Sequence, residues 1–397
     1  MKKQYTTLLA AALTMGLTLT ACKDDNKVTP TVPEGLADIE FLEENTSVTT
    51  ANSKNWGAYS VQVAHLLSKD ATELEQAWKN RYRNGTAFAE IFKNPTTGSA
   101  YTSYINCAEQ IIDGCVDIAN EVGTAKIGEP RDYWEKGKYQ QAVYAVESWY
   151  SFHSIEDYSN NILSIQNAIN GQRSNTPATH SLAAYMQKNN NALYSTLQAS
   201  ITAAYNAIEN MAAPFRAHIG SSSVLVAMDA CAKLNEILDR QVKGYMSQIP
   251  ESELKLIIEQ YVDAVVLPTY EDLAKENQTL LTRVKELNAA LQSGNKADID
   301  KSFEAAALQW MTARRPWETS EAFLFGPVDE LGLDPNMDSW PLDVNALRTM
   351  LNNGNFTGTE YGEGANQETV EAAQNVRGFH TLEFLLFKQG KPRTLEE

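Results

Sequence analysis

One histidine of this chain lies in a segment whose neighbours are nearly all apolar. His380 and Glu383 stand three residues apart in the segment 378–387, which reads GFHTLEFLLF. On a helix this spacing puts the imidazole and the carboxylate on one face, and a helix that is apolar nearly all round is buried. Buried polar groups need hydrogen bonds, each other or a metal ion. The segment therefore predicts either a structural His–Glu pair or part of a ligand site, and Gly378 would let another backbone or a ligand approach closely.

The spacing H-x-x-E is not by itself the signature of a zinc peptidase. Those signatures are H-E-x-x-H and H-x-x-E-H, and Phe384 stands where the second form needs its second histidine. Of the five histidines, His380 alone has this apolar setting, so a metal site built here would consist mainly of carboxylates. One imidazole with several carboxylates suits iron or another hard to borderline divalent cation better than a structural zinc ion.

Two further segments carry polar side chains at helical spacing. Glu318 and Glu321 share a face and could bind one cation together, but Arg314 can equally pair with Glu318 across one helical turn. In the segment 147–161, Ser, Asp and Asn are poor residues for a helix interior, so they are either exposed or held there by a function. The candidates for site residues in that segment are Glu147, Ser148, Ser151, Asp157 and Asn161.

Helices must position these side chains, because helical periodicity dominates the chain and strand-like alternation is nearly absent. Continuous helices are expected over 134–170 and over 251–292, the second kinked at Pro268. Long amphipathic helices with short connections are typical of helix bundles. We therefore predict an all-α fold of two four-helix-bundle-like domains packed side by side. The expected domains are residues 37–250 and residues 251–397.

The first residues predict export and a lipid anchor. A basic start precedes the apolar residues 8–19, which are too short to span a bilayer as a mature helix. Residues 19–22 read LTAC, the bacterial lipoprotein pattern, so we expect residues 1–21 to be a signal peptide and Cys22 to be lipidated. An ordinary secretory signal with an incidental cysteine is the alternative. Residues 22–36 are then a lipidated tether.

Charge and hydropathy limit the partners. The net charge of −17 argues against nucleic acid and against anionic membrane surfaces. No later segment is apolar enough to cross a membrane, so we expect membrane contact through the lipid anchor only. The expected location is the cell envelope at the outer membrane, facing either the periplasm or the cell surface.

Several motifs together resemble the imelysin-like family, in the family's order. The resemblance covers the opening helix YVDAVVLPTY, the block R-x-x-W-E-x-S-E-x-F-x-F-G-P, the turn D-S-W-P and the signature G-x-H-x-x-E-F-L-L. In this chain the block contains Trp317, the turn contains Trp340, and the signature contains Gly378. The matched residues are 261–270, 314–327, 338–341 and 378–386.

In the usual family order, a second bundle follows the G-x-H-x-x-E helix. Here the segment 147–161, followed by Gly171, resembles the E-S-x-x-S…D…N…G helix of that second bundle, yet it lies in front. We infer a circular permutation in which the two halves exchange places in the sequence but pack as usual. Chain ends that lie close together at the surface make such an exchange tolerable.

The resemblance implies a ligand site between the two bundles, where segments 147–161, 314–321 and 380–383 converge around at least one Arg–carboxylate pair. It also implies a link to iron uptake and to envelope transport partners. The family was classed as M75 metallopeptidases, so a metal-dependent peptidase is one hypothesis. The missing second histidine favours another, a non-catalytic protein that binds iron or a related cation. A third is an interaction lipoprotein that binds a small anion or a peptide.

Overall fold

The computed structural model of the chain describes residues 46–83 and 85–396, and helices dominate them. The all-α prediction is confirmed. The predicted signal peptide 1–21, tether 22–36 and lipidated Cys22 lie outside the described residues. Among the residues that the structure describes, no helix combines the length and the apolar character needed to cross a membrane.

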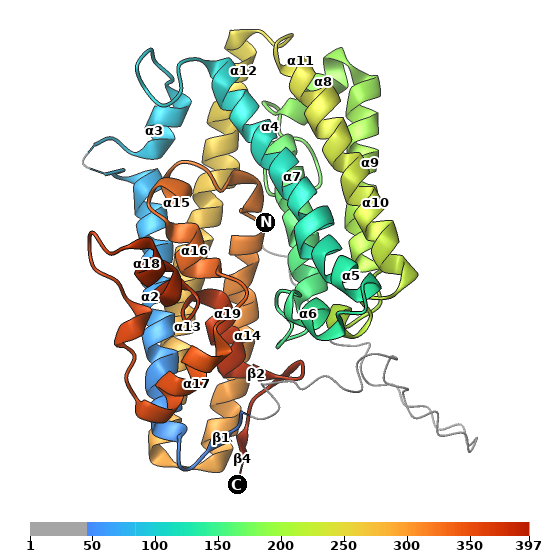
Figure 1. Cartoon of the computed structure of the whole chain (residues 1–397). Helices are drawn as coiled ribbons and strands as arrows, with labels where there is room; N and C mark the ends of the chain where they lie inside the picture. The colour runs from blue at the N-terminus through green and yellow to red at the C-terminus, as the bar shows by residue number, and fades with distance from the viewer. Residues whose placement is uncertain (1–45, 84, 397) are drawn as a thin grey trace.

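The first group of helices is built on three long helices. α13 (Leu267–Ser293) packs along both α2 (Ser53–Lys79) and α14 (Lys296–Glu318), and α19 (Gly378–Leu386) packs against α2 and α14 (Figure 1). The remaining elements on this side are β1 (Val48–Thr49), α3 (Phe88–Lys93), α12 (Glu251–Tyr261), η4 (Val262–Val266), η5 (Glu321–Phe323), α15 (Pro327–Glu330), α16 (Leu333–Asp338), α17 (Val344–Asn353), η6 (Thr357–Thr359), α18 (Gln367–Gln374), β2 (Phe387–Lys388), β3 (Lys391–Pro392) and β4 (Leu395–Glu396).

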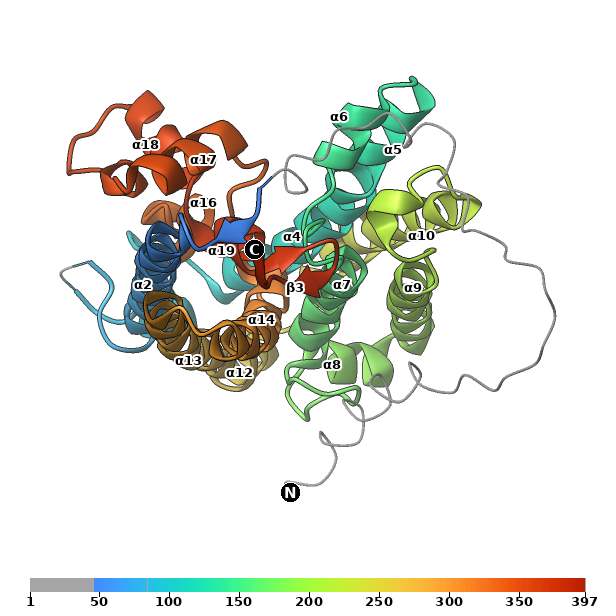
Figure 2. The ribbon, with the colours of Figure 1, turned by 90° about the horizontal axis from the view of Figure 1, so that it is seen from below.

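The second group is a ring of four helices. α4 (Tyr104–Glu121), α7 (Ser154–Asn170), α9 (Asn191–Glu209) and α10 (Ser222–Glu236) each pack against the next, and α10 closes the ring on α4 (Figure 2). The other elements of this group are η1 (Val122–Lys126), α5 (Gly128–Glu135), α6 (Tyr139–Tyr144), α8 (Leu182–Asn189), η2 (Phe215–Ala217), η3 (Ile237–Val242) and α11 (Lys243–Met246).

α2 belongs to the first group although it comes from the first half of the chain. Trp56, Tyr59 and Val63 share one face of α2 and are fully buried. The indole N–H of Trp56 donates to the carbonyl oxygen of Leu385 at 2.9 Å, which ties α2 to α19. The helices are therefore not grouped by the expected boundary at residue 250, because the apolar face of α2 packs on helices from the other half.

The helix expected over 134–170 is broken twice, and that prediction is wrong for residues 136–138, between α5 and α6, and for residues 145–153. Residues 145–153 form an irregular loop before α7 begins at Ser154. Within the loop, Ser148 and Phe152 have φ angles of 50° and 65°, a left-handed conformation that is uncommon for residues other than glycine. The loop thus turns back toward the seam between the two groups instead of continuing as a helix.

The segment expected as a kinked helix over 251–292 stays helical throughout. α12 passes through the π-helix η4 (Val262–Val266) into α13, whose second residue is Pro268. Proline has no N–H, and its ring clashes with the carbonyl four residues earlier in a regular helix. That residue lies within η4, so the wider π turn falls where the proline needs it.

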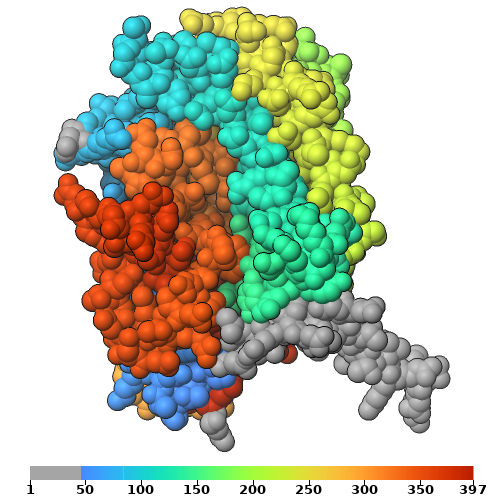
Figure 3. Space-filling view, viewed as in Figure 1, coloured from blue at the N-terminus to red at the C-terminus, as the bar shows by residue number. Residues whose placement is uncertain are grey.

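Two short sheets close the structure near the chain ends. β1 pairs with β4 in parallel, with Val48 opposite Leu395, and β2 pairs with β3 in an antiparallel hairpin. The first and last described strands are therefore neighbours, as a circular permutation requires. Figure 3 shows the two groups of helices meeting along a seam, and in the seam α7 packs against α14 and α4 packs against η5.

Candidate functional site

Arg314 of α14 is the centre of a buried polar network in this seam. Its side chain is fully buried, Nη2 lies 2.6 Å from Oε1 of Glu318, and Nε lies 3.4 Å from Oδ2 of Asp157. Nη1 pairs with Oδ1 of Asp338. Burial opposes the positive charge, but these carboxylates, led by Asp338, raise the pKa of Arg314 well above its usual value. The guanidinium therefore stays charged and holds three elements together.

Asp338, the last residue of α16, connects Arg314 to the histidine. Its Oδ2 accepts a hydrogen bond from the indole N–H of Trp317 at 2.6 Å, and its Oδ1 lies 3.2 Å from Nε2 of His380. Burial raises the pKa of this carboxyl, but the positive charges of Arg314 and then His380 lower it by more than burial raises it. The pKa therefore lies well below its usual range. Asp338 is therefore ionised at neutral pH.

His380 and Glu383 form the pair that their spacing predicts, and both are fully buried. Nδ1 of His380 lies 3.2 Å from Oε2 of Glu383, and Oε1 of Glu383 accepts hydrogen bonds from both the backbone N–H and the hydroxyl of Ser151 at 2.8 Å. The ring of Trp340 packs against the imidazole, with centroids 4.8 Å apart. The pair thus links α19 to the irregular loop of the second group.

Gly378 allows α16 to come this close to α19. Its φ is +83°, and a Cβ built on it would lie 2.4 Å from the carbonyl oxygen of Met337. No side chain fits that space, and the backbone conformation itself favours glycine. The predicted close approach of another backbone is therefore present, and it places Asp338 beside His380.

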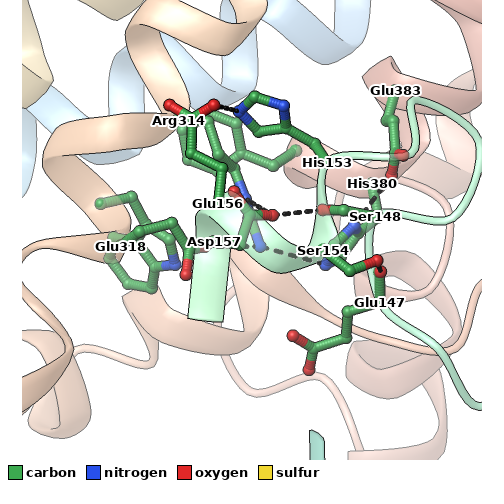
Figure 4. A network of polar contacts seen from close by, with 12 residues as sticks. Glu147, Ser148, His153, Ser154, Glu156, Asp157, Arg314, Glu318, His380 and Glu383 are labelled. Atoms are coloured by element: carbon green, nitrogen blue, oxygen red, sulfur yellow. Dashed lines mark hydrogen bonds and ion pairs between the residues drawn. The ribbon is translucent and has the colours of Figure 1, made fainter. Parts of the chain in front are cut away.

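Segment 147–161 reaches the same network from the second group. The hydroxyl of Ser148 donates to Oδ2 of Asp157 at 2.5 Å, and the side-chain amide of Asn161 donates to Oε2 of Glu318 at 2.6 Å. Figure 4 shows Ser148, Asp157 and Glu318 gathered with Arg314, His380 and Glu383. Oδ1 of Asp157 and Oδ1 of Asn161 are buried, and neither finds a hydrogen-bond partner within the described parts of the chain. Both are free to accept from a ligand or to bind a cation.

A second charged cluster adjoins the first. Nζ of Lys126, the last residue of η1, lies 3.2 Å from Glu147, 3.4 Å from Glu321 and 3.9 Å from Glu121. The lysine side chain is only 4% exposed. Glu321 follows Glu318 by three residues, so the two clusters are continuous across the seam.

Negative charge exceeds positive charge in this region. Two cationic side chains, Arg314 and Lys126, face six carboxylates that are buried or nearly so. Burial, more than any other cause, raises the pKa of Glu318 to about 8 and that of Glu321 well above its usual range. Without a further cation, Glu318 is therefore mostly protonated at neutral pH, and burial favours the protonated form of Glu321. The six carboxylates are Glu147, Asp157, Glu318, Glu321, Asp338 and Glu383.

Three of these carboxylates fit around a single cation. Glu318, Glu321 and Asp338 each offer an oxygen, and the three oxygens lie within 4.8 Å of one another. That separation suits ligands on different sides of one ion. The nearest imidazole nitrogen is Nε2 of His380, beside Asp338.

The structure brings the three predicted segments into one network, which contains an Arg–carboxylate pair. Reasoning from the sequence missed Asp338 and Lys126 as members. Asp338 opens the D-S-W-P turn, so the motif carried a signal for it, whereas no pattern around Lys126 distinguished it. The predicted residues that contact one another around Arg314 and Glu383 are His380, Glu318, Ser148, Ser151, Asp157 and Asn161, while Glu147 and Glu321 surround Lys126.

The chain is similar to two proteins that bear on this site. It is 29% identical over 174 residues to "Iron-regulated protein A" of Synechococcus elongatus, and the match covers 44% of this chain but only 39% of that protein. A crystal structure of an imelysin peptidase from Bacteroides ovatus superposes with a TM-score of 0.85 at 46% identity, covering 89% of this chain and all of that one. The family model of imelysin (peptidase M75) matches residues 17–241 and 266–397, and the chain belongs to that family.

Proposed function

We propose that the buried site between the two groups of helices binds a divalent cation of the iron type and does not catalyse hydrolysis. One observation carries the proposal, namely the excess of carboxylates over cationic side chains in a region that water hardly reaches. Buried charges need compensation. A bound cation would supply it and would displace the proton from Glu318.

The donor atoms indicate which cation is suitable. Glu318, Glu321 and Asp338 would hold it through oxygen, and the imidazole of His380 is the nearest nitrogen donor. Hard to borderline ions such as ferrous iron or manganese prefer this mixture. Because Glu318 and Asp338 now contact Arg314, the guanidinium would have to share these carboxylates or shift.

The link to iron comes from the relative whose name states that it is regulated by iron. We propose that this chain serves iron uptake in the cell envelope together with transport partners, anchored by a lipid on Cys22. The residue pattern around Cys22 supports that location. A Cys22→Ala variant should leave the membrane fraction, and its continued sedimentation with membranes in high salt would count against the anchor.

The peptidase alternative needs a free general base. Both carboxylate oxygens of Glu383 are already in use, because Oε1 accepts hydrogen bonds from Ser151 and Oε2 pairs with His380. This geometry supports a role for Glu383 in positioning His380 instead. Chelator-sensitive cleavage of unfolded protein that is lost in Glu383→Gln would reverse this ranking.

Calorimetric titration of the purified protein with ferrous iron under anaerobic conditions tests cation binding. We expect one ion per chain, and we expect Glu318→Gln with Glu321→Gln to weaken binding by about 100-fold or more, since both changes remove a charged ligand. Glu304, which is exposed on the same helix α14, provides the control, and Glu304→Gln should bind as the unmodified protein does. Equal iron binding by the unmodified protein, by the double variant and by Glu304→Gln would show that the ion binds elsewhere.

A further inference from the structure

We propose that Lys126 is a tethered cation at the entrance of this site, and that an incoming metal ion displaces its ammonium group on the way to Glu318. The inference rests on the proposed function and adds a route and a competing charge to it. Lys126 contacts both Glu121, whose side chain is half exposed, and Glu321, whose side chain is buried. An ion that enters there must exchange with the ammonium group.

The carboxylates around Lys126 form a path of decreasing exposure. The side chain of Glu121 is 50% exposed, that of Glu147 is 18% exposed and that of Glu321 is 5% exposed. Lys126 lies within 4 Å of all three. The next carboxylate along the path, Glu318, is fully buried and contacts Arg314. Negative charge therefore leads from the surface to the cation site, with one ammonium group in its way.

Lys126 is held by charge rather than by well-aligned hydrogen bonds. Within the described residues the only hydrogen bond of its ammonium group runs to Oε1 of Glu321 at 3.4 Å, a long distance for such a contact. Oε2 of Glu147 is buried and lies 3.2 Å from the ammonium nitrogen, yet it accepts no hydrogen bond. Arg314, by contrast, makes short contacts with Glu318 and Asp338. Of the two cationic side chains in this network, Lys126 therefore has the longer and less directional contacts.

The backbone conformation of η1 determines the direction of the Lys126 side chain. It ends the π-helix η1, which follows α4 directly. A π turn contains an extra residue and so changes which face the following side chains occupy, and such turns are frequent at functional sites. Close packing supports the turn, because a Cβ on Gly123 would lie 2.9 Å from Cβ of Cys231. The turn therefore directs the ammonium group into the seam.

The exchange needs no covalent step. A divalent ion bound by Glu147 and Glu321 would bring two positive charges to carboxylates that now share one with Lys126. The flexible lysine stem can then carry its ammonium group toward Glu121, the most exposed of its three partners. Glu318 and Asp338 would then hold the metal ion.

Stopped-flow mixing of the purified protein with ferrous iron, read by tryptophan fluorescence, tests this role, because Trp317 and Trp340 contact Asp338 and His380. Lys126→Met keeps the length of the side chain and removes the charge. We expect it to bind iron faster and about tenfold more tightly, which corresponds to about 1.4 kcal/mol. Lys126→Arg should slow binding, since the planar fork of arginine pairs with two carboxylates at once and is harder to displace.

The control is Lys136→Met, which removes an exposed lysine paired with Asp132 and should leave the rate unchanged. Circular dichroism checks that each variant is folded. If Lys126→Met does not fold, Lys126→Arg, which keeps the buried positive charge, still tests the proposal through its slower binding. Binding by Lys126→Met that matches or falls below that of Lys136→Met would overturn the role of Lys126 while leaving the cation site intact. If neither the unmodified protein nor Lys126→Met binds iron, the proposed function itself fails.

Discussion

Single residues set the charge of the site, and Glu318 shows how. Burial raises the pKa of this carboxyl to about 8, Arg314 opposes the shift, and Asp157 adds to it. In the unfolded chain the same group titrates near 4.5. Between these two values the folded protein holds a proton that the unfolded chain releases. A metal-free site is therefore partly neutralised by protons, and a cation has to compete with them.

We predict that the metal-free protein loses stability as the pH rises from 5 to 8. Because the pKa of Glu318 is higher in the folded state, its contribution to stability is complete below about pH 4.5 and is lost as the pH passes through about 8, at up to about 1.4 kcal/mol per pH unit. Urea denaturation across this range measures the effect. Glu318→Gln should flatten the dependence, and a stability that rises with pH in both proteins would contradict the assignment.

At the scale of elements, the helices could be predicted and the irregular loop could not. Alternation of apolar residues with the helical period identifies α2, α13 and α14. Nothing local forbids a helix over residues 145–153, however, because Ser148 and Phe152 take left-handed conformations without being glycine. Contacts distant in the sequence hold them there. The guanidinium of Arg216 stacks over the rings of Trp149 and Phe152, at 4.5 and 4.6 Å from their centroids.

The approach of α16 to α19 gives a prediction at this scale. Gly378→Ala introduces a Cβ that meets the carbonyl of Met337 and imposes an unfavourable backbone conformation, so we expect the protein to lose roughly 2 kcal/mol or more of stability. Iron binding should weaken as well, since the change moves Asp338 away from His380. Gly362→Ala is the matched control, because a Cβ there has nothing within 4 Å. A similar, small loss in both variants would show that the close approach is dispensable.

At the scale of the whole molecule, the order of the motifs carried information that helix periodicity did not. The motifs predicted that segments 147–161 and 378–386 would meet, and Ser151 does contact Glu383. The position of α2 was beyond such reasoning. An apolar helix face shows that a partner is needed, but not which helix provides it, and α2 joins the half that follows it in the sequence. The pairing of β1 with β4 brings the first and last described strands together, an arrangement compatible with the exchange of halves inferred from the sequence.

The central claim is that this seam holds a metal ion. Crystals of the protein grown with ferrous iron, with diffraction recorded on both sides of the iron absorption edge, test it most directly. The account predicts one strong anomalous peak at roughly 2 Å from carboxylate oxygens of Glu318, Glu321 and Asp338. Iron found only at exposed carboxylates on the surface, with Arg314 still filling the space between Glu318 and Asp338, would contradict it.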